Sequence, residues 1–367
     1  MGLKILYGVV GEGMGHATRS SVILDHLLSQ GHQVRAVASQ RAFQFLKDRF
    51  DTVGRIHGLH IKYDDEGVQR RQTFLSNVLQ LPENIGTNVG QYFEMLDVFE
   101  PDVVISDFDS FTWLYATNHR KPILSIDNMQ ILNRCRHENL PSSHQADFRI
   151  AKALVKSKLP GCDHYLITSF FFPPIRKRRT SLYPPILRRA VLDATPSQGE
   201  HILVYQTSHS TNAILPALQR MKQYEFRVYG TNREEDLGNV KLFKFSETGF
   251  IENLASARAV VANGGFSLMS ECVYLHKPML SVPVPGQFEQ ILNAHYLRSL
   301  GYGEHWEALD EDLLVHFLRN VPRYQENLAS YQQAGNSKIF EALDEYLPML
   351  AAGKEIPTPN ADFDGDD

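Results

Sequence analysis

A histidine in a glycine-rich segment near the start of the chain has the chemistry of a base. Residues 11–16 read Gly-Glu-Gly-Met-Gly-His and follow an apolar run at 3–10, which predicts a strand and then a turn. His16 could take a proton from a hydroxyl group, because the ordinary pKa of histidine lies near neutrality. The alternative is a histidine that only begins a helix. The glycines around it favour the base, so we predict His16 as the catalytic residue.

The glycines of this turn do not have the spacing of a dinucleotide site. Gly11, Gly13 and Gly15 are spaced G-x-G-x-G, whereas the dinucleotide fingerprint requires G-x-G-x-x-G. His16 occupies the third glycine position, and the next predicted strand ends in Ser39 instead of an acidic residue that would bind a ribose. A nicotinamide or flavin cofactor is therefore not expected.

Two acidic residues could orient the histidine. Asp107 and Asp109 follow a predicted buried strand at 102–106. A carboxylate beside a base histidine fixes its tautomer and stabilises the imidazolium that forms. Either residue could be this partner, or both could instead cap the next helix. The Asp-Phe-Asp order also matches a metal-binding DxD motif, but two acids alone are a weak metal signal, and we expect no metal ion.

A second glycine turn, later in the chain, has the features of an anion site. Residues 263–265 (Asn-Gly-Gly) join an apolar run at 258–262 to a predicted helix at 266–276. The amides at the start of that helix and the Ser267 hydroxyl could bind phosphates without a lysine. Glu271 is then placed to accept hydrogen bonds from a ribose diol. In the alternative interpretation, the polar residues are only turn and cap residues and Glu271 is exposed.

Amide and carboxylate side chains follow the next predicted strand. Gln287, Glu289 and Gln290 lie in a loop that opens a helix containing Asn293. Side chains of these two kinds, next to one another, suit the several hydroxyl groups of a hexose. This loop is the predicted sugar site.

These segments resemble the donor-binding signature of two-domain inverting glycosyltransferases of the GT-B fold. Among them, the chain is similar to the peptidoglycan lipid-intermediate N-acetylglucosaminyltransferase and to the UDP-glycosyltransferases. The residues that carry the resemblance are Asn263-Gly264-Gly265, Ser267, Glu271, Pro278, Pro283, Glu289-Gln290 and Asn293-Ala294, with the Gly13-x-Gly15-His16-x-x-Arg19 turn. Many UDP-glycosyltransferases have a histidine at position 263 and a Trp-Asn pair where Phe266-Ser267 stands here, so the donor stays open.

The resemblance implies a role for each matching residue. The diphosphate, ribose, sugar and base of the donor would contact Thr207, Ser208, Thr248, Gly249, Phe250, Asn263, Gly264, Gly265, Ser267, Glu271, Gln287, Glu289 and Gln290. The acceptor loop would comprise Gly11, Gly13, Gly15 and Arg19, with His16 as the base.

The expected reaction is a single in-line displacement with inversion at the anomeric carbon. The donor would be a nucleotide sugar acting as co-substrate, a UDP-hexose or UDP-N-acetylhexosamine, and no metal ion would be required. The acceptor would be a hydroxyl group of a glycan, a lipid or a small molecule, with a lipid-linked or cell-envelope glycan as one candidate. Two alternatives stay open: a UDP-sugar 2-epimerase of the same architecture and a non-catalytic sugar-nucleotide-binding protein.

The elements that must position these residues alternate regularly between strand and helix. That alternation predicts α/β architecture with parallel sheets. With the resemblance, we expect two Rossmann-like doubly wound domains that face each other across a cleft, as in GT-B proteins. The predicted boundaries are 1–170 for the N-terminal acceptor domain, 171–198 for a Pro-rich linker, 199–350 for the nucleotide-sugar domain and 351–367 for an acidic disordered tail.

Composition excludes several other classes of protein. The net charge of −5 over 367 residues argues against nucleic acid as a partner. Three cysteines without metal-ligand spacing fit a reducing compartment. No signal peptide or membrane span is predicted, so we expect a cytoplasmic protein. The basic run at 176–179, next to aromatic residues, could add peripheral contact with the cytoplasmic face of a membrane, although a solvated linker explains it equally well.

Overall fold

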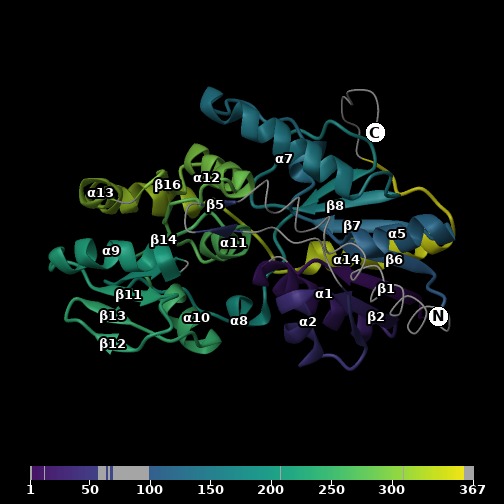
Figure 1. Cartoon of the computed structure of the whole chain (residues 1–367), viewed down its shortest axis with the longest axis horizontal. Helices are drawn as coiled ribbons and strands as arrows, with labels where there is room; N and C mark the ends of the chain where they lie inside the picture. The colour runs from purple at the N-terminus through teal and green to yellow at the C-terminus, as the bar shows by residue number, and fades with distance from the viewer. Residues whose placement is uncertain are drawn as a thin grey trace. The chain divides into compact units, whose positions relative to one another are not determined.

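The computed structural model consists of two units, each built around a seven-stranded sheet (Figure 1). The structure describes residues 2–11, 13–56, 63–64, 67–68, 99–206, 208–308 and 310–358. Unit 1 comprises the chain up to Asp64, Val68–Ile186 and Gly335 onward, and unit 2 consists mainly of Leu187–Ala334. No helix in the described ranges is both long and apolar enough to cross a membrane.

The sheet of unit 1 has the strand order β3-β2-β1-β6-β7-β8-β9, and its strands pair in parallel. These strands are β1 (Lys4–Val9), β2 (Gln33–Ala38), β3 (Val53–Arg55), β6 (Val103–Asp107), β7 (Ile123–Asp127), β8 (His164–Thr168) and β9 (Thr180–Tyr183). The helices are α1 (Met14–Ser29), α2 (Gln40–Lys47), α5 (Ser110–His119), α6 (Ile131–Arg134), α7 (Gln145–Lys158) and α14 (Ser337–Ala351), with a 3₁₀ turn at Ser142–His144. The short strands β4 (Tyr63–Asp64) and β5 (Gly67–Val68) pair separately.

The sheet of unit 2 has the order β12-β13-β11-β10-β14-β15-β16 and is parallel except at the β12 edge. Its strands are β10 (Ile202–Tyr205), β11 (Phe226–Tyr229), β12 (Glu235–Asp236), β13 (Val240–Leu242), β14 (Ala259–Ala262), β15 (Met279–Ser281) and β16 (Gly303–His305). Its helices are α8 (Arg189–Leu192), α9 (Ser208–Arg220), α10 (Glu247–Ala255), α11 (Phe266–Tyr274), α12 (Phe288–Ser299) and α13 (Glu311–Leu328).

Among the parallel strands of each sheet, the strand order reverses once. The reversal falls between β1 and β6 in unit 1 and between β10 and β14 in unit 2. Loops leave such a point in opposite directions, and ligands of doubly wound proteins bind there, at the carboxyl ends of the strands. The predicted base, its carboxylate partner and the predicted phosphate turn all follow strands at these two points.

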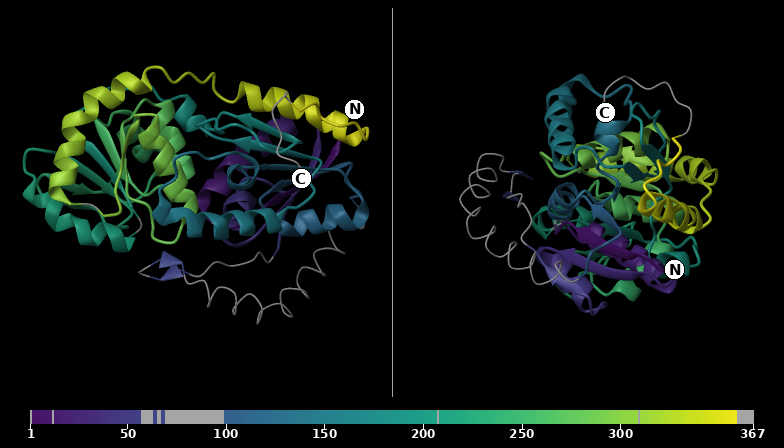
Figure 2. Two further views of the ribbon diagram at one scale, coloured as in Figure 1. Left: turned by 90° about the horizontal axis from the view of Figure 1, so that it is seen from above. Right: turned by 90° about the vertical axis from the view of Figure 1, so that its right-hand side faces the viewer.

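The last helix belongs to unit 1, and this corrects the predicted second domain of 199–350. Ile339, Leu343, Leu347 and Leu350 recur along one face of α14 and pack into the core of unit 1. Figure 2 shows this helix in yellow against the sheet of unit 1. An amphipathic periodicity predicts that a helix buries one face, but it does not indicate which of two cores receives that face.

The predicted linker and tail are also partly wrong. Within 171–198, residues 180–183 form β9, which pairs with β8 at the sheet edge, and the proline pairs on either side bound this short strand. Within the predicted disordered tail, Ile356 is buried in the core of unit 1, and the backbone amide of Arg179 donates to Thr358 Oγ1 (3.2 Å). Residues 359–367 lie outside the described residues.

The basic run at 176–179 does not form one exposed basic surface. Lys177 is buried, and Arg176 is half-buried and donates through Nε to the carbonyl oxygen of Asn133 (3.1 Å). Only Arg178 and Arg179 of the run are exposed. The cationic surface available to a membrane in this run is therefore half of what the sequence predicts.

Candidate active site

The turn that carries His16 is shaped by two glycines. Gly13 has φ of 88°, a conformation that L residues with a side chain rarely adopt, and it precedes the first turn of α1. A Cβ atom on Gly11 would lie 2.5 Å from Ser39 Oγ, so only glycine lets the backbone pass the end of β2 this closely. His16 therefore lies in the first turn of α1 and not on a free loop, and Gly15 lies inside the same helix.

His16 contacts the carboxylate at the end of the neighbouring strand. Its Nδ1 lies 2.7 Å from Oδ1 of Asp107, which is fully buried. The parallel register that pairs Val9 with Asp107 places the end of β6 beside the start of α1. The structure thus brings together the predicted base and one of its two predicted partners.

Asp107 is surrounded by donors that keep it ionised. Arg19 donates through Nε to Oδ2 (2.9 Å) and through Nη2 to Oδ1 (2.5 Å), and Ser20 Oγ donates to Oδ2 (2.8 Å). Burial alone would raise the pKa of Asp107, but the charge of Arg19 and the hydrogen bonds from His16 and Arg19 hold it well below its usual range. Asp107 therefore remains an anion at neutral pH.

An ionised Asp107 determines which nitrogen of His16 holds the proton. When Nδ1 donates to Oδ1, Nε2 keeps its lone pair and can accept a proton from a substrate hydroxyl group. Arg19 Nη2 lies 2.6 Å from the same Nδ1, and because both atoms are then donors, Oδ1 is the acceptor that they share. This is the arrangement of a histidine base held by a buried carboxylate.

The other candidate partner, Asp109, has a different function. It is the N-cap of α5, and its side chain accepts from Thr112 N (2.8 Å) and Thr112 Oγ1 (2.9 Å). Phe108, between the two acids, has φ of 55°, which turns their carboxylates to different partners. The alternative of helix capping thus describes Asp109, while Asp107 holds the histidine.

Arg19, predicted in the acceptor loop, points away from solvent. Its side chain is 6% exposed, and besides Asp107 it contacts Asn128 Oδ1 through Nη1. An arginine committed to two buried partners is not free to bind an acceptor. The structure therefore gives Arg19 a role in holding Asp107.

In unit 2, the turn after β14 leaves the start of α11 open. Gly265 precedes the first helical residue, no described side chain caps this end of α11, and no described atom lies within 4 Å of a Cβ built on Gly265. Ser267 is half-buried in the first turn. The amides at the positive end of a helix are suited to an anion such as a diphosphate.

Gln290 and Asn293 hold this turn in place. Gln290 Oε1 accepts from the amides of Gly264 (3.1 Å) and Val284 (3.0 Å), and its Nε2 donates to Gln287 Oε1 (2.5 Å). Asn293 Nδ2 donates to the Gly264 carbonyl oxygen (3.1 Å). Gln290, predicted to bind the sugar, therefore uses its amide group within the protein.

Two other predicted residues, Asn263 and Glu289, also make contacts within the protein. Asn263 Nδ2 donates to the Val282 carbonyl oxygen (2.9 Å), which ties the turn to the end of β15. Glu289 is half-buried in the first turn of α12 and lies 3.5 Å from Asn293 Nδ2 through Oε1.

Glu271 is buried and paired with an arginine that the sequence did not single out. Arg188 Nε lies 2.8 Å from Oε1, and Arg188 Nη2 lies 2.9 Å from Oε2. Glu271 is 5% exposed, so the alternative of an exposed glutamate is wrong. Burial raises the pKa of Glu271, and Arg188 acts against this. The one sequence signal for Arg188 is its position three residues after the second proline pair.

The predicted base-recognition residues lie in the first turns of α10. Thr248, Gly249 and Phe250 follow the N-cap Ser246, whose Oγ accepts from Gly249 N (3.4 Å) and whose carbonyl oxygen accepts from Phe250 N (2.8 Å). Phe250 is buried and packs edge-on against Tyr229. These two amides are thus already engaged. Ser208 begins α9 directly after β10, and Thr207 lies outside the described residues.

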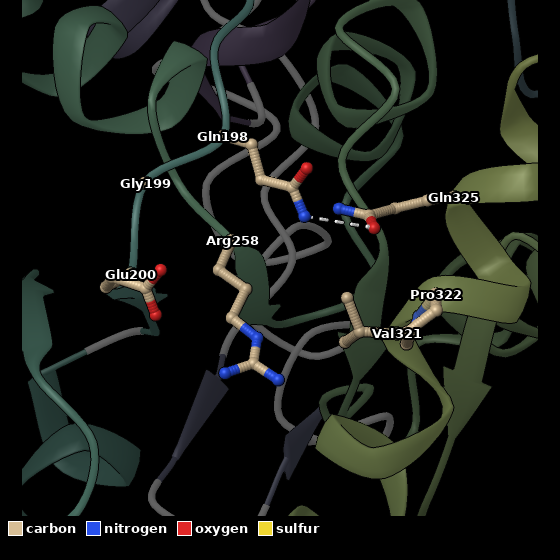
Figure 3. Close-up of a pocket in the computed structure, with 7 residues that line it drawn as sticks. All are labelled: Gln198, Gly199, Glu200, Arg258, Val321, Pro322 and Gln325. Carbon is tan, nitrogen blue, oxygen red and sulfur yellow. Dashed lines mark hydrogen bonds between the residues drawn. The ribbon is translucent and has the colours of Figure 1, made fainter.

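A polar pocket of about 440 Å³ lies elsewhere in unit 2 (Figure 3). Its lining residues are Gln198, Gly199, Glu200, Arg258, Val321, Pro322 and Gln325. Glu200 lies two residues before β10 and Arg258 lies one residue before β14, so the pocket is at the amino ends of these strands. The start of α11, in contrast, follows the carboxyl end of β14. None of the predicted donor residues lines this pocket.

The chain is similar to proteins named as glycosyltransferases. The chain is 22% identical over 343 residues to an uncharacterised glycosyltransferase of Methanosarcina acetivorans, covering 82% of this chain and 85% of that protein. It is 26% identical over 282 residues to the UDP-N-acetylglucosamine–N-acetylmuramyl-(pentapeptide) pyrophosphoryl-undecaprenol N-acetylglucosamine transferase of Chlamydia pneumoniae, covering 67% and 74%.

The solved structure of the glycotransferase of kitacinnamycin shares the fold. It superposes with a TM-score of 0.67 at 16% identity, over 95% of this chain and all of that one. The predicted GT-B fold is thereby confirmed. The model of glycosyl transferase family 1 matches residues 3–322. With a histidine and carboxylate pair in unit 1, a glycine turn before a helix in unit 2 and this match over most of its length, the chain belongs to glycosyl transferase family 1.

Proposed function

We propose that this glycosyltransferase moves a sugar from a nucleotide-sugar donor, a UDP-hexose or a UDP-N-acetylhexosamine, to an acceptor hydroxyl group with inversion. The observation that carries the proposal is the 2.7 Å contact between His16 Nδ1 and Oδ1 of the fully buried Asp107. A lipid-linked or cell-envelope glycan is the acceptor class that we favour, and the name of the Chlamydia pneumoniae relative supports it.

In the proposed reaction, His16 acts on the acceptor. Its Nε2 takes the hydroxyl proton as the acceptor oxygen attacks the anomeric carbon, and Asp107 stabilises the resulting imidazolium. The bond from that carbon to the diphosphate oxygen breaks on the opposite face, and the bonding pair leaves with the diphosphate. One displacement of this kind inverts the anomeric configuration.

The leaving diphosphate would be stabilised by the start of α11. Charge on the diphosphate grows as the bond breaks, and fixed amide dipoles favour that charge without having to reorganise. We propose that the amides after Gly265 and the Ser267 hydroxyl supply this stabilisation, so that no metal ion is required. Glu271 would bind the ribose. We place the reaction at the cytoplasmic face of a membrane, where a lipid-linked acceptor would be available.

A two-step experiment tests the proposal. Thermal unfolding in the presence of UDP, dTDP and GDP sugars identifies the donor as the ligand that raises Tm most. That donor is then incubated with the protein alone and with candidate acceptors, and the products are followed by NMR. We expect an inverted glycoside only when an acceptor is present. Conversion of the donor to its 2-epimer without an acceptor, or binding with no turnover for any acceptor, would contradict it.

A further inference from the structure

We propose that Arg188 is a positioning residue of the donor site, which fixes the carboxylate of Glu271 so that its remaining lone pairs are available to a ribose diol. This inference rests on the proposed function, because it takes the donor ribose as the ligand of Glu271. Arg188 itself is not proposed to touch the donor.

The contact between the two side chains is bidentate. Nε of Arg188 is 2.8 Å from Oε1 and Nη2 is 2.9 Å from Oε2. Two parallel hydrogen bonds of this kind fix the plane of a carboxylate as well as its position. Glu271 is 5% exposed and the Arg188 side chain 16%, so water does not readily replace either partner. Glu271 thus has one orientation.

The hydrogen-bonding capacity of a carboxylate leaves room for the ribose. Its two oxygens offer about four lone-pair sites. The guanidinium group of Arg188 uses one site on each oxygen, so one site on each remains. Two acceptor sites on adjacent oxygens match the 2′- and 3′-hydroxyl groups of one ribose.

Arg188 also connects Glu271 to the helix predicted to bind the base. Its Nη1 lies 3.1 Å from Oε1 of Glu247, the first residue of α10. Thr248, Gly249 and Phe250 follow directly in that helix. Arg188 therefore links Glu271, the proposed ribose ligand, to the start of α10, where the base is predicted to bind.

The neighbouring arginine supplies a matched control. Arg189 carries the same charge one residue later, but its side chain is 85% exposed and pairs with Asp193 four residues on. A substitution at Arg189, the first residue of α8, removes one positive charge next to Arg188 without touching Glu271. Any effect specific to Arg188 must then come from its contacts and not from net charge.

The experiment weakens the contact between Glu271 and the ribose in two ways, by removing a hydroxyl group from the nucleotide and by substituting Arg188. Calorimetry measures the Kd of UDP and of 2′-deoxy-UDP for the wild type, Arg188→Met, Arg188→Lys and Arg189→Met. A hydrogen bond to a charged group is worth about 10- to 100-fold in Kd, so we expect 2′-deoxy-UDP to bind the wild type more weakly by that factor. Arg188→Met should weaken UDP binding similarly and bind both nucleotides alike. Arg188→Lys should recover part of the discrimination, and Arg189→Met should match the wild type.

The possible outcomes separate the inference from the function on which it rests. Full discrimination between the two nucleotides in Arg188→Met, or unchanged UDP affinity there, overturns the role of Arg188 while the ribose contact of the wild type stands. A wild type that binds both nucleotides alike overturns the ribose role of Glu271, and with it both the proposed donor site and this inference. Thermal unfolding of each variant without nucleotide shows whether Arg188→Met is folded, and Arg188→Lys provides the same comparison with the charge retained.

Discussion

Replacing His16 with alanine should separate its proposed role in catalysis from its contribution to folding. The imidazole makes one hydrogen bond to Asp107, which keeps its contacts to Arg19 and Ser20 when the ring is gone. The loss in the free energy of unfolding should therefore not exceed that of one charge-assisted hydrogen bond, about 1.5–3 kcal/mol. Loss of a general base lowers the rate by about 10²–10⁴-fold, or about 3–5 kcal/mol of activation free energy.

The assay measures kcat for transfer at saturating donor and, separately, the Kd of UDP by calorimetry. We expect kcat to fall by the stated factor while the Kd is unchanged, because the predicted donor residues all belong to unit 2. His26→Ala is the matched control: His26 is also on α1 and also contacts an aspartate, with Nε2 2.8 Å from Asp344 Oδ1. A fall of less than about tenfold for His16→Ala, or an equal fall for His26→Ala, would refute the assignment of the base.

Three further changes test the packing and the charges. Asp107→Asn removes the carboxylate that is paired with the buried guanidinium of Arg19, so the free energy of unfolding in urea should fall by about 3–5 kcal/mol; a wild-type value would contradict the ion pair. Gly264→Ala would place a methyl group 2.6 Å from the Gln290 carbonyl oxygen and should cost about 1–3 kcal/mol in thermal unfolding, whereas Gly265→Ala, which meets no described atom within 4 Å, should not; equal losses would refute the close approach. Burial lowers the pKa of His164 from 6.5 to about 4, so the folded state stays neutral where the unfolded state is protonated. Stability should then fall as the pH drops from 6.5 to 4, by up to about 1.4 kcal/mol per pH unit, and His164→Gln should reduce that slope; an unchanged slope would show that another group titrates.

Sequence patterns predicted the two sheets and the edges at which the site residues lie. A strand followed by a glycine turn and a helix is a local signal, and each predicted site residue of this kind follows a strand at a reversal of the strand order. The choice between Asp107 and Asp109 is not local. The direction of the two carboxylates depends on the backbone at Phe108, and its positive φ cannot be predicted from the sequence.

The contact that sequence reasoning missed joins a predicted residue to a distant segment. Arg188 and Glu271 are 83 positions apart, and nothing in the spacing around either residue indicates the other. Gln290 looked like a sugar ligand because its amide group can bind a hydroxyl, but two backbone amides of the turn and loop nearby use the same oxygen. Composition indicates what a side chain can bind, whereas tertiary packing determines what it does bind.

The return of the chain to unit 1 has a consequence for synthesis on the ribosome. Leu187–Ala334 emerges before Ser337–Ala351, so unit 2 has its whole sequence available while the sheet of unit 1 still lacks a covering helix. The apolar surface that will contact Ile339, Leu343 and Leu347 stays uncovered until α14 has been translated. Nascent chains with unburied apolar surface are targets for chaperones and for aggregation. Unit 1 therefore begins to be translated before unit 2 but completes its core after it.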